Sequence, residues 1–194
     1  MITTDRRVKR TEKLLMDALI RLSLERGYDT LTIKDITDQA DVAYSTFFRH
    51  YPDKPALLAA MVGETLTTLR NLIRQLPEDT PEEEGRVLFQ HINEHEALYR
   101  AILSSRDSKD VMQPVLEEIQ QDLITHYQAY GPAAIPLDVA ANHVVTAIIA
   151  LVNWWLKHGK PYSIEQMGTI YSELIIKATV RSAFGVDKSS GEDF

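Results

Sequence analysis

The sequence predicts an all-α fold of about nine helices. Apolar residues recur at helical spacing through most of the 194 residues, and no stretch alternates as a strand would. Signals for helix starts and stops divide the chain into segments joined by short breaks. We expect one domain of three helices over residues 1–54, a second helical domain over 55–186, and a disordered tail over 187–194.

The first of two closely spaced helices begins at a capping box. The Thr32 hydroxyl can accept from the backbone N–H of Asp35, whose carboxylate can reach back to the N–H of Thr32. Ile33 and Ile36 then continue the helix with apolar residues. Asp41 follows in the turn, where Asp tolerates a left-handed backbone. The turn is therefore expected to be tight.

A second helix is expected from Ala43 to Tyr51, because Pro52 disfavours helical backbone in the residue before it. Phe47 and Tyr51, four residues apart, can point inward. Asp53 can cap the next helix. Two helices joined by a turn of about 3–4 residues form a helix-turn-helix, whose second helix enters the DNA major groove.

The outer face of this second helix carries groups that can contact DNA. Arg49 can donate to guanine or phosphate, and Phe48 can pack on a thymine methyl group. The alternative is that Tyr44 and Phe48 belong to the core and Arg49 is a solvated charge. The candidate DNA-binding residues are Thr32, Ala43, Tyr44, Ser45, Thr46, Phe48, Arg49, His50 and Lys54.

Residues 10–60 resemble the DNA-binding domain of the TetR/AcrR family of bacterial transcriptional regulators. The resemblance implies phosphate contacts at Thr32 and Lys54, base or backbone contacts on the second helix, and a C-terminal domain that dimerises and binds an effector. The matching residues are Leu15, Ala18, Leu19, Leu22, Glu25-Arg26-Gly27-Tyr28, Thr32-Ile33, Asp35-Ile36, Ala40, Val42, Thr46-Phe47-Phe48, His50-Tyr51, Asp53-Lys54 and Leu57-Leu58.

Three positions depart from the family pattern. Asp41 stands where the family usually has Gly, and Ala43 stands where a Ser or Thr usually supplies a cap and a phosphate contact. Phe48 replaces the usual Tyr, so its contact is apolar. The binding mode carries over from the family, whereas the operator sequence does not.

The charge is unevenly distributed along the chain. The formal net charge is −7, but residues 1–54 hold 10 Lys and Arg against 9 Asp and Glu, a net charge of +1. Such a protein suits a short specific site and not general binding to polyanions. The N-terminus carries a basic cluster that can follow the phosphate backbone, the alternative being a solvated end; its residues are Arg6, Arg7, Lys9, Arg10 and Lys13.

The composition limits the cellular compartment that we expect and the kinds of catalytic or metal site that the chain can form. The absence of cysteine excludes disulfides, thiol catalysis and thiolate zinc sites, and the N-terminus lacks the apolar stretch of a signal peptide. The longest apolar run, 144–152, is interrupted by Thr146 and is far shorter than the roughly 20 residues that span a bilayer. We expect a cytoplasmic protein with no membrane partner.

Five further helices are expected over residues 53–75, 82–104, 109–130, 137–158 and 163–184. The helix over 137–158 is apolar nearly all round and must be covered on every side. The family resemblance implies that this helix and the last helix pair with their copies in a four-helix homodimer interface, the alternative being an internal helix of a monomer. The candidate interface residues are Val145, Ile149, Val152, Ile170, Leu174 and Ala178.

The helical domain also supplies polar and aromatic residues for a small-molecule pocket, although aromatic residues at this spacing are more often core. His91 and His95 share a helix face, but with no third ligand we expect neither a metal site nor a cofactor. The candidate pocket residues are His91, His95, Tyr99, Met112, Tyr127, Asn153 and Trp154.

The resulting hypothesis is a sequence-specific DNA-binding regulator, a ligand-responsive repressor that binds a palindromic operator as a homodimer. The alternative is an all-helical small-molecule-binding module or enzyme without a DNA role. No phosphate-binding glycine loop, His-Glu-x-x-His or Gly-x-Ser-x-Gly motif supports an enzyme.

Overall fold

The computed structural model describes residues 2–77, 80–104 and 108–185, so the tail predicted over 187–194 lies outside the described residues. Helices account for nearly all regular structure in these ranges, and none of the described residues forms a strand. The predicted all-α fold is therefore confirmed. The chain divides into two compact units, and each is described by itself.

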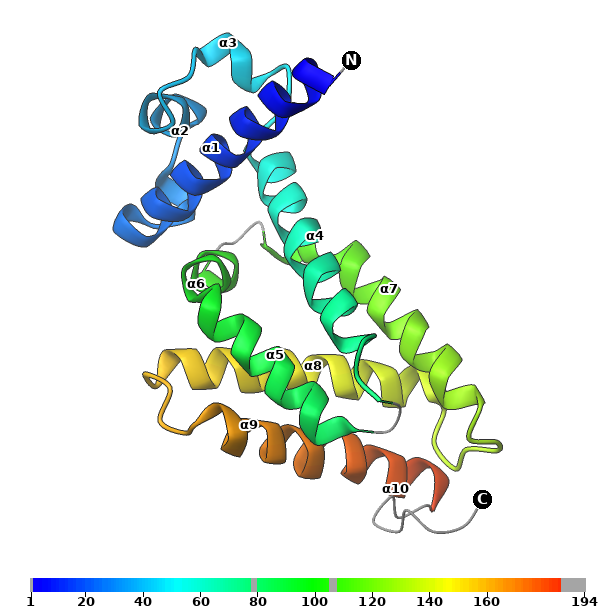
Figure 1. Ribbon diagram of the computed structural model, residues 1–194. Coiled ribbons are helices and arrows are strands. Elements are labelled where there is room, and N and C mark those ends of the chain that lie inside the picture. Colours follow the sequence, from blue (N-terminus) through cyan, green and yellow to red (C-terminus); the bar gives the residue numbers. More distant parts are fainter. Residues whose placement is uncertain (1, 78–79, 105–107, 186–194) are drawn as a thin grey trace. The chain divides into compact units, whose positions relative to one another are not determined.

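The first unit holds residues 1–67 and 95–113. It contains α1 (Ile2–Arg26), a 3₁₀ turn η1 (Tyr28–Thr30), α2 (Ile33–Gln39), α3 (Tyr44–Phe47), the start of α4 (Lys54–Ile73) and α6 (Glu96–Ser104) (Figure 1). Helix α1 packs against η1, α2 and α6. The domain boundary predicted after residue 54 lies near the start of α4 and within the first unit, which continues to residue 67. The unit's core is apolar and is formed by buried side chains that include Leu15, Leu19, Leu22, Ile36, Phe47, Leu57 and Leu58.

The predicted capping box and turn are both present. The Thr32 hydroxyl accepts from the Asp35 N–H at 3.1 Å, and the Thr32 N–H donates to the Asp35 carboxylate at 2.9 Å. Asp41 adopts a left-handed backbone with φ of 53°. Helix α3 ends at Phe47, earlier than the predicted Tyr51, and the N–H groups of Arg49 and His50 then bond three residues back, to the Thr46 and Phe47 carbonyls. Helix α3 is therefore short and is followed by a tight turn.

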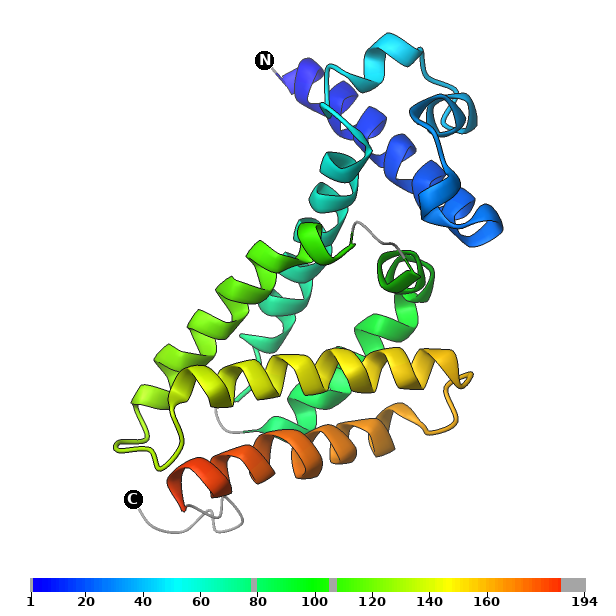
Figure 2. The same cartoon turned by 180° about the vertical axis from the view of Figure 1, so that it is seen from behind.

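The second unit holds residues 68–94 and 114–194 and contains α5 (Pro81–Glu94), most of α7 (Ser108–Gln128), and α8 (Leu137–Lys157). The final stretch comprises α9 (Ile164–Tyr171), a π-helical segment η2 (Ser172–Lys177) and α10 (Ala178–Phe184), and Figures 1 and 2 both show it lying along α8. The core between α7, α8 and α10 contains Tyr127, Ala140 and Val180.

Glycine allows α5 and α9 to approach each other closely. A Cβ built on Gly168 would lie 2.8 Å from the Glu82 carbonyl oxygen, and one on Gly85 would lie 2.7 Å from the Tyr171 ring. Neither position has room for a larger side chain unless the helices separate. This contact sets the geometry of the cleft described below.

Two predicted helices differ from the structure. The helix expected over 82–104 is broken, since α5 ends at Glu94 and the N–H groups of Leu98 and Tyr99 bond to the His95 carbonyl to start α6. The apolar periodicity of the sequence continues across this break, so it does not predict where α5 ends. The helix expected over 163–184 contains the π-helical segment, which periodicity at 3.6 residues per turn does not predict.

Among the described residues, α8 is the one helix long and apolar enough to cross a membrane by length and composition. Buried helices of globular proteins pass the same test, and Val144, Trp155 and Leu156 of α8 are buried within the second unit. The helix therefore contributes to the core of the second unit, and it also exposes apolar residues such as Val139 and Trp154.

Candidate nucleic-acid interface

Helix α3 and the turn after it expose a mixed aromatic and basic face. Tyr44 is 54% exposed and Phe48 is 47% exposed, and their rings meet edge to face with centroids 5.3 Å apart. Arg49 is exposed next to them. Beneath this face Phe47 and Tyr51 are buried, as the sequence predicted. The packing of Phe47 and Tyr51 thus turns the outer residues toward solvent.

The other candidate residues at the start of this helix have small, uncharged side chains. Ala43 is the N-cap of α3 and makes no side-chain capping bond, since it lacks a hydroxyl. Ser45 is exposed and Thr46 is partly exposed. A hydroxyl on an exposed helix surface can bond either a base or a phosphate. Ser45 and Thr46 therefore extend the polar part of the exposed face.

Thr32 is already engaged in the capping box. Its hydroxyl also donates to the Asp35 carboxylate at 2.5 Å. The Thr32 hydroxyl and N–H together hold the pKa of Asp35 below its usual value. Asp35 further pairs with Arg26 at 3.4 Å, which ties the start of α2 to the end of α1. Thr32 therefore acts as the N-cap of α2 in this structure.

His50 and Lys54 turn toward the protein. The His50 side chain is 10% exposed, and its Nδ1 lies 3.3 Å from Oε1 of Glu12 in α1. The Lys54 ammonium donates to the carbonyls of Tyr28 and Leu31. The DNA contacts predicted for both side chains remain predictions, and the structure shows that each side chain also has a partner within the first unit. Their partners lie between 23 and 38 residues away in the chain.

The basic cluster at the N-terminus belongs to α1, which begins at Ile2. Arg6, Arg7 and Arg10 are exposed along this helix. The contact between Glu12 and His50 joins α1 to the turn after α3, and these cations belong to the same compact unit as α3. They add local positive charge to that unit.

The seven candidate pocket residues are divided between the two units. Tyr127 is buried in the core of the second unit, where burial raises its pKa to about 12, whereas Asn153 and Trp154 lie exposed on α8. His95, Tyr99 and Met112 belong to the first unit, and there burial raises the pKa of Tyr99. Since α5 ends at Glu94, His91 and His95 do not share a helix. Of the seven residues, His91 alone lines the cleft of the second unit.

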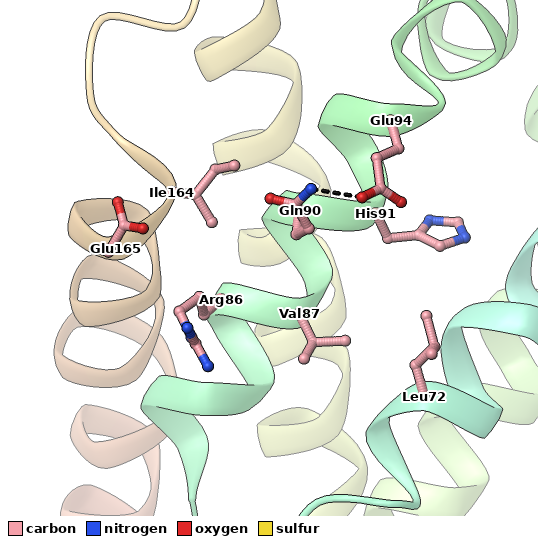
Figure 3. Close-up of a pocket in the computed structure, with 8 residues that line it drawn as sticks. All are labelled: Leu72, Arg86, Val87, Gln90, His91, Glu94, Ile164 and Glu165. Carbon is pink, nitrogen blue, oxygen red and sulfur yellow. Dashed lines mark hydrogen bonds between the residues drawn. The ribbon is translucent and has the colours of Figure 1, made fainter.

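That cleft has a volume of about 430 Å³ and crosses α5 (Figure 3). Its walls combine the apolar Leu72, Val87 and Ile164 with charged and polar groups. In Figure 3 the Gln90 amide bonds to the Glu94 carboxylate, and the separation is 2.5 Å. Sequence reasoning missed seven of the lining residues, and no local pattern marks them, since they come from α4, α5 and α9. They are Leu72, Arg86, Val87, Gln90, Glu94, Ile164 and Glu165.

Comparison with known proteins decides the family. Residues 15–61 match the family described as bacterial regulatory proteins, tetR family, and residues 79–177 match the transcriptional regulator C-terminal region of the same family. The chain belongs to the TetR family. It is therefore a DNA-binding transcriptional regulator of the helix-turn-helix type, and the resemblance drawn from its sequence is confirmed.

The relatives of this TetR-family chain are distant. It is 24% identical over 183 residues to the HTH-type transcriptional regulator YuxN of Bacillus subtilis, an alignment that covers 87% of this chain and 56% of YuxN. The chain thus spans little more than half the length of that relative, and less of two others that it matches.

Solved structures share the fold of this TetR-family chain. A chain from Syntrophomonas wolfei assigned to the same family superposes with a TM-score of 0.75 at 16% identity, covering 89% of this chain and 96% of the other. The regulator FadR of Bacillus subtilis, solved in complex with stearoyl-CoA, gives a TM-score of 0.65 at 17% identity and covers 84% and 97%. At these identities the likeness establishes the fold alone.

The six residues predicted for a dimer interface of this TetR-family chain separate into two groups. Val145 and Val152 are buried within the second unit, so their side chains pack against their own chain. Ile149, Ile170 and Ala178 are partly exposed. Leu174 is 69% exposed, the highest value among the large exposed apolar side chains. Of the six residues, Leu174 therefore offers the most apolar side-chain surface to a partner, and the two valines offer the least.

Proposed function

We propose that this chain is a ligand-responsive repressor that binds a palindromic operator as a homodimer. The exposed face of α3 is the observation that carries the proposal. It joins Tyr44, Ser45, Phe48 and Arg49 on a helix-turn-helix whose other face is buried. On this basis the protein acts in the cytoplasm and is not an enzyme.

Each group on the α3 face has a distinct part in the proposal. Arg49 donates to a guanine edge or a phosphate, and Phe48 offers an apolar contact for a thymine methyl group. Tyr44 packs edge to face against Phe48 and supports it while its own hydroxyl reaches the phosphate backbone. Arg6, Arg7 and Arg10 add sequence-independent attraction from α1.

The dimer follows from the outward apolar surface of the second unit. Leu174 on η2, with Val139 and Trp154 on α8, exposes large apolar side chains that water solvates poorly. A second copy that covers them would place two recognition helices together. Such dimers read half-sites about 34 Å apart, or a multiple of that spacing, which is why the operator is expected to be palindromic.

The cleft across α5 is the proposed effector site. Its volume lies at the lower end of the range that holds small ligands, and it mixes apolar walls with a few polar groups. Bacillus subtilis FadR, which shares the fold, was solved in complex with stearoyl-CoA, which supports a small-molecule ligand on this fold. An effector that binds one conformation better than another shifts the population away from the DNA-binding state.

Selection of DNA by the purified protein tests the proposal. Wild-type protein and Arg49→Ala are each incubated with a library of random 30-base-pair duplexes, and the bound fragments are sequenced over several rounds. We expect wild type to enrich an inverted repeat, and Arg49→Ala to enrich a repeat with one degenerate position in each half-site. Sedimentation of the enriched duplex with wild-type protein should give an even number of chains on each duplex.

Two outcomes contradict the proposal. Enrichment of no sequence by wild type would favour the alternative, a helical binding module or enzyme without a DNA role. Enrichment of a single asymmetric site bound by one chain would contradict both the proposed homodimer and the proposed palindromic operator. The effector is sought afterwards, by screening small molecules for release of the selected duplex.

A further inference from the structure

We infer that Lys54 is a positioning residue. Its ammonium holds the start of α4 against the backbone of residues 28–31, which directly precedes α2. Its Nζ donates to the Tyr28 carbonyl at 2.9 Å and to the Leu31 carbonyl at 3.0 Å. The same ammonium lies 4.1 Å from the centroid of the Tyr28 ring. A side chain that family resemblance assigns to phosphate is thus committed to three groups of its own chain.

The Leu31 carbonyl needs a donor of this kind, while the Tyr28 carbonyl also accepts from the Leu31 N–H at 3.1 Å. Tyr28 and Leu31 are buried, and they bracket the 3₁₀ turn between α1 and α2. A hydrogen bond from a cation to a buried carbonyl is stronger than one between neutral groups, and a buried carbonyl without a donor is costly. The tetrahedral ammonium can point two protons at two carbonyls while it rests on an aromatic face.

Helix preference does not account for a lysine at this position. Lys54 is the first residue of α4, and Asp53 caps the helix by accepting from the Ala56 N–H at 2.8 Å. A cation in the first turn lies at the positive end of the helix macrodipole, which disfavours it. The cost is offset by the tertiary contacts with Tyr28 and Leu31.

The position of these contacts gives them a role in DNA recognition. Leu31 directly precedes Thr32, the N-cap of α2, and α2 packs against α3. The ammonium therefore joins α4 to the segment that places the recognition helix. Loss of this link would leave each helix intact but free the α2–α3 pair to shift against α4. Base contacts need close alignment, whereas attraction to phosphates tolerates small shifts.

Three variants test the inference: Lys54→Met, Lys54→Arg and, as a control, Lys13→Met, which removes an exposed lysine from α1. Urea unfolding without DNA is measured first. Affinities for the duplex selected by wild type and for poly(dI-dC) are then measured over a range of NaCl concentrations, at a temperature where each variant is folded by circular dichroism. The unfolding measurement needs no DNA, so failure of the repressor proposal would leave it interpretable.

The positioning role predicts a specific pattern. Lys54→Met should unfold at lower urea and lose about tenfold in affinity for the selected duplex, the size expected for losing a charge-assisted hydrogen bond. Its affinity for poly(dI-dC) and its salt slope should match wild type. Lys54→Arg should lose part of the selected affinity, because a planar guanidinium does not reproduce the ammonium geometry. Lys13→Met should unfold as wild type.

Other results overturn the inference. If Lys54 holds a phosphate, Lys54→Met would lower both affinities equally and reduce the salt slope by about 0.9, with unfolding unchanged. If Lys54 only stabilises the fold, folded Lys54→Met would bind the selected duplex as tightly as wild type. If Lys54→Met does not fold, Lys54→Arg provides the test. A phosphate contact would survive the exchange of lysine for arginine, so wild-type affinity of Lys54→Arg for the selected duplex would refute the positioning role.

Discussion

Nδ1 of His50 lies 3.3 Å from Oε1 of Glu12, which ties the turn after the recognition helix to α1. The His50 side chain is 10% exposed and the Glu12 side chain 34%, so this contact is partly shielded from water. It joins residues 38 positions apart in the chain. Together with the Lys54 site, it holds the recognition segment from two sides.

Breaking this contact should weaken DNA recognition without removing a DNA contact. We expect His50→Ala to lower the free energy of unfolding by about 1 kcal/mol and to reduce operator affinity at an unchanged salt slope. Urea unfolding of His50→Ala, Glu12→Ala and the double variant gives the coupling energy, expected to be about 0.5 kcal/mol or more. Additive effects would mean that the two side chains do not interact in solution.

The capping box predicts how the first unit responds to acid. The pKa of Asp35 is lowered from 3.8 by the hydroxyl and N–H of Thr32, so the folded state favours the carboxylate. The resulting stabilisation is fully present above the unfolded pKa and is lost as pH falls through the lower folded pKa. In urea unfolding between pH 2 and 7, Asp35→Asn should show a shallower loss toward acid than wild type. Thr32→Ala, which leaves the carboxylate but removes the hydroxyl, should lie between them.

Two glycines in helices provide a matched pair for testing the α5–α9 contact. A Cβ on Gly168 would meet the Glu82 carbonyl at 2.8 Å, whereas one on Gly63 in α4 would meet no atom within 4 Å. We expect Gly168→Ala to destabilise the protein by about 1–3 kcal/mol through overpacking. Gly63→Ala should stabilise it by about 0.4–1 kcal/mol, since Ala loses less backbone entropy on folding. Equal effects in urea unfolding would refute the close approach of the two helices.

Leu174 tests the dimer surface, and Leu24 of α1 is its control. Leu174 is 69% exposed and Leu24 is 51% exposed, so either position accepts an arginine without burying it in a monomer. In sedimentation at micromolar concentration, Leu174→Arg should yield monomers because a charge would be trapped in the dimer interface. Leu24→Arg should sediment as wild type. A dimeric Leu174→Arg, with unfolding unchanged, would place the interface elsewhere.

Features that depend on residues three or four apart were predictable from the sequence. The capping box of Thr32 and Asp35, the left-handed Asp41 and the burial of Phe47 and Tyr51 all appear as expected. Each depends on local hydrogen bonds or on helical periodicity, and both can be read from neighbouring residues. The exposure of Tyr44 and Phe48 followed from the same periodicity.

The tertiary structure alone decided where the longer side chains go. His50 and Lys54 turned inward because Glu12 and the carbonyls of Tyr28 and Leu31 lie within reach in the folded unit, although they are far away in the chain. The break at His95 and the burial of Val145 likewise depend on packing, which periodicity does not encode. A sequence fixes which groups are available over one turn of helix, whereas the partner of a flexible cation or an imidazole is chosen by the segments that folding brings beside it.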